Sequence, residues 1–133
     1  MMNRRYLLSF CLAATMLTAG VAIAKDAELR LRTRLAGGAI SGLTPSGGSE
    51  YRERGSRASF KAEVEDVNLP AGTMVSVMAN GNKVGEIKIS AAPIRGGELE
   101  LSSQDGDLVP SLKANTTITI VGPDGAILAG VLQ

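Results

Sequence analysis

The chain has 133 residues, a net charge of +1, no histidine, no tryptophan and a single cysteine, Cys11. Without histidine and with one thiol, it cannot form a Ser-His-Asp triad, a Cys-His catalytic pair or a zinc site of imidazole or multiple thiolate ligands. Aromatic residues make up 3% of the chain, which leaves few side chains for stacking on sugar rings or nucleic-acid bases.

The first 24 residues have the composition of a secretory signal peptide. Arg4 and Arg5 precede an apolar run, and Ala22-Ile23-Ala24 places small residues where a signal peptidase reads them. Cleavage there leaves residues 25–133, which we predict to form one periplasmic or secreted domain without a membrane span. This domain has 12 basic and 13 acidic residues, so its nearly neutral charge does not favour nucleic-acid binding.

Apolar and polar side chains alternate with a period of two after residue 25, as in half-buried β-strands. We predict nine strands, at residues 28–35, 39–42, 49–54, 58–67, 73–79, 83–90, 98–102, 116–121 and 126–132. Asn80-Gly81 and Pro123-Asp124-Gly125 predict hairpins, because Asn and Gly tolerate the positive φ of tight turns. The pattern predicts an all-β fold, an antiparallel β-sandwich (Ig-like or similar) of about seven to nine strands. A closed barrel is the alternative.

The alternation also predicts which side chains face the core. They are Leu29, Leu31, Leu35, Phe60, Ala62, Val64, Val75, Val77, Ile87, Ile89, Leu99, Leu101, Ile118, Ile120, Ile127 and Val131. The last strand carries no charge, and we treat it as a candidate sheet edge that could add to a partner's sheet.

Residues 29–35 read LRLRTRL and place Arg30, Arg32 and Arg34 on one face of the first strand. Unpaired, these guanidinium groups would lie about 6.6–7 Å apart and could bind the phosphates or carboxylates of a protein or an anionic envelope polymer. Paired with acidic neighbours, they would be ordinary surface charge. The order of strands in the sheet decides between the two interpretations.

A second charged face lies on the strand predicted at residues 49–54, where Glu50, Arg52 and Arg54 share one side. If this strand pairs with the following one through the turn at residues 55–56, we expect Arg52 and Arg54 to meet Glu63 and Glu65 across the sheet. Each such pair would contribute a few tenths of a kcal/mol.

Asp105 and Asp107 are the candidate metal ligands, since carboxylate oxygens in an extracellular loop suit Ca²⁺. An EF-hand would need more acidic residues at defined spacing, and its bidentate glutamate would fall on Thr116. An Asp-Gly turn after the strand at 98–102 is therefore the favoured interpretation.

Segment 47–72 runs a strand into Phe60-x-x-x-Val64 and a Leu69-Pro70 turn, followed by GELEL and DGDLVP. This arrangement resembles the CHRD domain, and the resemblance implies an exported β-sandwich-like module. CHRD domains carry a His-x-His motif, which this chain lacks, so no metal role is implied.

Together these features predict an exported, non-enzymatic module that acts through contacts with a protein or an envelope polymer, without a cofactor. The alternatives are a small-ligand or Ca²⁺-dependent binding module and a hydrolase that uses paired carboxylates. The candidate binding residues are Arg30, Arg32, Arg34, Arg52 and Arg54.

Overall fold

The computed structural model describes residues 27–133, so the predicted signal peptide lies outside the described residues. This part of the chain contains eight strands and a short 3₁₀ turn, η1 (Ser103–Asp105). The strands are β1 (Leu29–Ala36), β2 (Ser46–Arg54), β3 (Arg57–Glu65), β4 (Met74–Ala79), β5 (Asn82–Lys88), β6 (Gly97–Ser102), β7 (Thr117–Gly122) and β8 (Gly125–Val131). Within residues 27–133, no helix is long and apolar enough to cross a bilayer.

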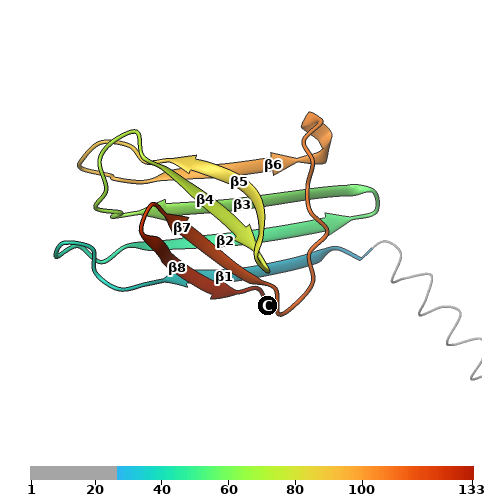
Figure 1. Cartoon of the computed structure of the whole chain (residues 1–133). Helices are drawn as coiled ribbons and strands as arrows, with labels where there is room; N and C mark the ends of the chain where they lie inside the picture. The colour runs from blue at the N-terminus through green and yellow to red at the C-terminus, as the bar shows by residue number, and fades with distance from the viewer. Residues whose placement is uncertain (1–26) are drawn as a thin grey trace, which may run out of the picture.

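All eight strands belong to one antiparallel sheet with the order β5-β4-β7-β8-β1-β2-β3-β6. The sheet curls so that β1, β2, β3 and β6 form one layer and the other four strands cross in front of it (Figure 1). The end strands β5 and β6 approach each other, and beyond them the Ser90 amide donates to the Gly96 carbonyl at 2.8 Å. The all-β prediction is confirmed. A sandwich of two separate sheets is not, because β1 pairs with both β8 and β2 and the sheet is a nearly closed barrel.

The predicted strand at residues 39–42 is a turn. Ile40 and Leu43 form an isolated bridge, with backbone hydrogen bonds of 2.8 and 3.2 Å. Between them Ser41 and Gly42 have φ angles of 49° and 87°. Strands do not use this left-handed region, so the chain reverses here between β1 and β2.

The Asn80-Gly81 hairpin between β4 and β5 is confirmed. The two residues have φ angles of 47° and 83°, as a type I′ turn requires. Asn80 also binds the neighbouring strand, because its Oδ1 accepts a hydrogen bond of 2.9 Å from the Thr117 amide. The Pro123-Asp124-Gly125 turn joins β7 and β8 as predicted.

The core lies between the two layers of the curled sheet. Most of the predicted core residues are buried, namely Leu31, Leu35, Phe60, Ala62, Val64, Val75, Val77, Ile87, Ile89, Ile118 and Ile120. Leu99, Leu101 and Ile127 are partly buried against this core. Leu29 and Val131 were predicted to be buried and each is 41% exposed.

The last strand shows why one set of core predictions is wrong. Both alternate sets of β8 are apolar, so its own pattern does not say which face points inward. Pairing with β7 places Leu128 opposite the buried Ile120, and Leu128 is therefore buried where Val131 is exposed. The predicted edge is also wrong, since β8 lies between β7 and β1.

Tyr51 is buried beside Phe60, and its hydroxyl donates a hydrogen bond of 2.8 Å to Glu53 Oε2. Burial, together with this bond, raises the pKa of Tyr51 above its ordinary value of 10.0. A raised pKa means that the folded state holds the proton more tightly than the unfolded state. The stabilisation that the protonated Tyr51 gives the fold is complete at pH values below the pKa of Tyr51 in the unfolded state. It is lost as the pH rises through the pKa of Tyr51 in the folded state.

We therefore expect the free energy of unfolding to fall as the pH rises above about 10, and less steeply in Tyr51→Phe than in the unchanged protein. Urea titrations at each pH measure both slopes, and tyrosinate absorbance reports the titration itself. Equal slopes in the two proteins would contradict this role of the phenol.

Candidate functional site

The predicted arginines of β1 lie on the outer face of the sheet, next to β2. In the antiparallel register Arg30 is opposite Arg52, and Arg32 is opposite Glu50. Leu31 on the other face of β1 is buried, while the arginines on either side of it are exposed. The strand is therefore an interior strand of the sheet with a charged outer face.

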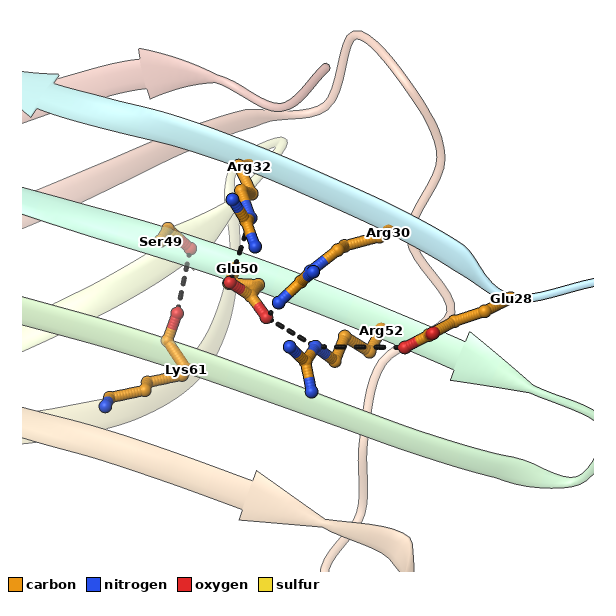
Figure 2. Close-up of polar contacts among 7 residues, drawn as sticks. All are labelled: Glu28, Arg30, Arg32, Ser49, Glu50, Arg52 and Lys61. Carbon is orange, nitrogen blue, oxygen red and sulfur yellow. Dashed lines mark hydrogen bonds and ion pairs between the residues drawn. The ribbon is translucent and has the colours of Figure 1, made fainter.

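Three guanidinium groups meet at one carboxylate. Oε1 of Glu50 lies 3.4 Å from Nε of Arg30 and 2.5 Å from Nε of Arg52, and Oε2 lies 3.1 Å from Nε of Arg32. Figure 2 shows the three side chains pointing toward Glu50 from two adjacent strands. Arg52 also lies 3.8 Å from Glu28. We call Arg30, Arg32, Arg52 and Glu50 the arginine cluster.

The cluster is open to solvent and has donors to spare. Its arginine side chains are 43–58% exposed. Burial opposes ionisation of Glu50, but the charges of Arg30, Arg52 and Arg32 outweigh it, so the pKa of Glu50 lies below its usual value. A guanidinium carries about five N–H donors and a carboxylate about four acceptor sites. One carboxylate therefore leaves most of these donors free for water or a ligand.

The other two predicted arginines flank the cluster. Arg34 lies opposite Gly48, which has no side chain to pair with it, and Arg54 lies opposite Arg57 at the end of β2. Within residues 27–133, neither has a carboxylate oxygen within 4.0 Å. The outer face of β1 and β2 is therefore basic.

The predicted pairs of Arg52 and Arg54 with Glu63 and Glu65 are wrong. The two-residue turn between β2 and β3 sets an antiparallel register in which the arginines lie next to the turn and the glutamates lie far from it. The partners of the two glutamates on β2 are Gly48 and Ser46. Glu63 and Glu65 therefore do not neutralise the arginine cluster.

The predicted metal ligands lie in the turn after β6. Asp105 ends η1, and Gly106 follows with a φ of 82°. Asp107 Oδ2 accepts a hydrogen bond of 3.0 Å from the Ser102 amide, so this carboxylate closes the turn. No group of three or more acidic side chains that could hold a metal ion occurs in residues 27–133. The Asp-Gly turn accounts for both residues.

A surface hollow of about 810 Å³ lies next to Arg34, at the end of β1. Its lining residues include Arg34, three glutamates and the 65% exposed Ile94; the glutamates are Glu63, Glu65 and Glu98. Three carboxylates against one guanidinium make the hollow acidic. It therefore does not extend the basic surface of β1 and β2.

The sequence pattern does not reveal that Glu50 is the shared partner of the arginines. It places Glu50 on the same face as Arg52, but contact with Arg30 and Arg32 depends on β1 lying beside β2 in one register. The connection between β1 and β2, residues 37–45, is too long to fix that register in the way a tight turn does. No local signal could have identified the contact.

Comparison with protein-family models, curated proteins and solved structures found no match. The resemblance to the CHRD domain therefore stays a prediction, and function is inferred from the residues of the site.

Proposed function

We propose that the protein is an exported, non-enzymatic β-module that binds anionic groups of a protein or envelope polymer through the arginine cluster, with Arg34 and Arg54 at its flanks. The main support for this proposal is that three exposed guanidinium groups share the Glu50 carboxylate and have more N–H donors than this carboxylate has acceptor sites. Arginine binds phosphate and carboxylate groups well because its planar fork donates two parallel hydrogen bonds.

Sequence features support the rest of the proposal. The leader in residues 1–24 favours the periplasm or the exterior, and the nearly neutral domain with few aromatic residues is unsuited to nucleic acid. Without histidine, and without cysteine once the leader is removed, the domain cannot form a Ser-His-Asp triad or a Cys-His pair. Ionic contacts need no cofactor.

Replacing Arg30, Arg32 and Arg52 together with glutamine tests the proposal on an anionic matrix such as phosphocellulose. We expect retention at low salt to weaken about 10- to 100-fold, because three exposed ion pairs contribute about 0.5–1 kcal/mol each. The affinity of the unchanged protein should fall as salt rises, since salt screens exposed charges.

The matched control removes three exposed lysines elsewhere on the molecule, Lys83, Lys88 and Lys113, by the same change to glutamine. It alters the net charge equally and leaves the cluster intact, so retention should change less than about twofold. Equal loss in both triple variants would show that net charge alone governs retention, and would refute a site at the cluster.

A further inference from the structure

We infer that Glu50 is an internal competitor, whose carboxylate occupies the place of the ligand's anionic group, and that the ligand is a linear polymer of phosphate groups that displaces it. This inference rests on the proposed function and adds its regulation and ligand class. It starts from the geometry in Figure 2, in which one carboxylate takes the Nε donors of Arg30, Arg32 and Arg52.

An incoming anion must replace Glu50 to reach the centre of the cluster, because both of its oxygens already contact guanidinium groups. Glu50 has another cation within reach of its strand position. Lys61 is directly opposite on β3, and its ammonium lies 3.7 Å from Glu98. A displaced Glu50 can therefore turn from β1 toward Lys61, whose ammonium it would share with Glu98.

The tethered carboxylate selects for a multivalent ligand. A group attached to the same fold competes at an effective concentration of the order of millimolar or more. A single free anion at lower concentration does not displace it. A polymer with repeated charges does, because its neighbouring groups also contact the flanking guanidinium of Arg34, about 13 Å from Arg30 along β1.

Phosphate matches the cluster better than carboxylate does. Three guanidinium groups present about fifteen N–H donors, whereas a carboxylate accepts at about four sites. A phosphate group has additional oxygens and forms bidentate bonds with arginine. A chain of phosphates laid along β1 would therefore satisfy more of the donors of Arg30, Arg32 and Arg34 than Glu50 does.

Calorimetric titration of the full protein with linear inorganic polyphosphate tests the inference through Glu50→Gln. The amide keeps the shape of the side chain and removes the competing charge. We expect polyphosphate to bind this variant about tenfold more tightly, as expected when a competing state that excludes the ligand is removed. The matched control, Glu86→Gln, makes the same charge change at an exposed position of β5, a strand that pairs with none of β1, β2 and β3, and should shift affinity less than about twofold.

The outcomes separate the inference from the proposed function. In one outcome, the unchanged protein binds polyphosphate and loses this binding when the three arginines are replaced. If Glu50→Gln then binds polyphosphate no more tightly than the unchanged protein does, Glu50 is a positioning residue and the competitor inference fails. If orthophosphate or polyglutamate binds as tightly as polyphosphate, the phosphate-polymer assignment fails. If neither the unchanged protein nor Glu50→Gln binds any of these anions, the proposed function itself fails.

Discussion

Replacing Phe60 with alanine is expected to lower the free energy of unfolding by about 3–5 kcal/mol. Phe60 is fully buried, and its strand neighbours in register are Tyr51 on β2 and Leu101 on β6. Phe60 and Tyr51 are the only aromatic side chains in residues 27–133. Because the hydrogen-bonded strands hold the walls of the core apart, we expect the cavity left by alanine to remain largely unfilled. Urea unfolding followed by circular dichroism measures the loss.

The control for this prediction is Phe60→Leu, which refills most of the space and should cost about 1–2 kcal/mol. A loss below about 1 kcal/mol for the alanine variant would contradict the assignment of Phe60 as a central packing residue.

Replacing Gly37 with alanine is expected to lower the free energy of unfolding by about 3 kcal/mol, at the upper end of overpacking costs. Gly37 follows the point where β1 meets β8, and a Cβ atom there would lie 1.8 Å from the Ile127 carbonyl oxygen. A backbone oxygen cannot rotate away as a side chain can, so the two strands must separate. The same urea titrations detect the effect.

The neighbouring Gly38 provides a matched control. A Cβ atom at this position has no heavy atom within 4 Å, so Gly38→Ala should change stability by no more than about 0.5 kcal/mol. Similar losses of stability in the two variants would mean that the close approach of β8 does not restrict the side chain at position 37. The pairing of β1 with β8 would then not be essential to the stability of the sheet.

Much of the local structure could be predicted because it depends on neighbouring residues. Alternation identified eight strands, and Asn80-Gly81 has backbone angles that few other residue pairs adopt. The strand predicted at residues 39–42 was wrong for a reason that is also local. Ala39 and Ile40 resemble a strand in sequence, and only the φ angles of the two residues after them reveal a turn.

The partners of the site could not be predicted in the same way. Arg30 and Arg32 share a face by alternation alone, but the long connection at residues 37–45 leaves open which strand lies beside them. The structure places β2 there and brings Glu50 to the centre of the arginines. On the other side of β2 the short turn keeps Arg52 distant from Glu63, which simple charge matching does not reveal.

The sequence by itself determined the all-β class, the hairpins, the row of arginines on one strand and the absence of histidine chemistry, because these follow from composition and from the period-two geometry of each strand. Only the tertiary structure decided that the strands form one nearly closed sheet, that β8 is an interior strand and that Glu50 lies among three guanidinium groups. The reason is that strand order and register arise from hydrogen bonds and packing between segments far apart in the chain, and a shift of one residue would turn every outward side chain inward.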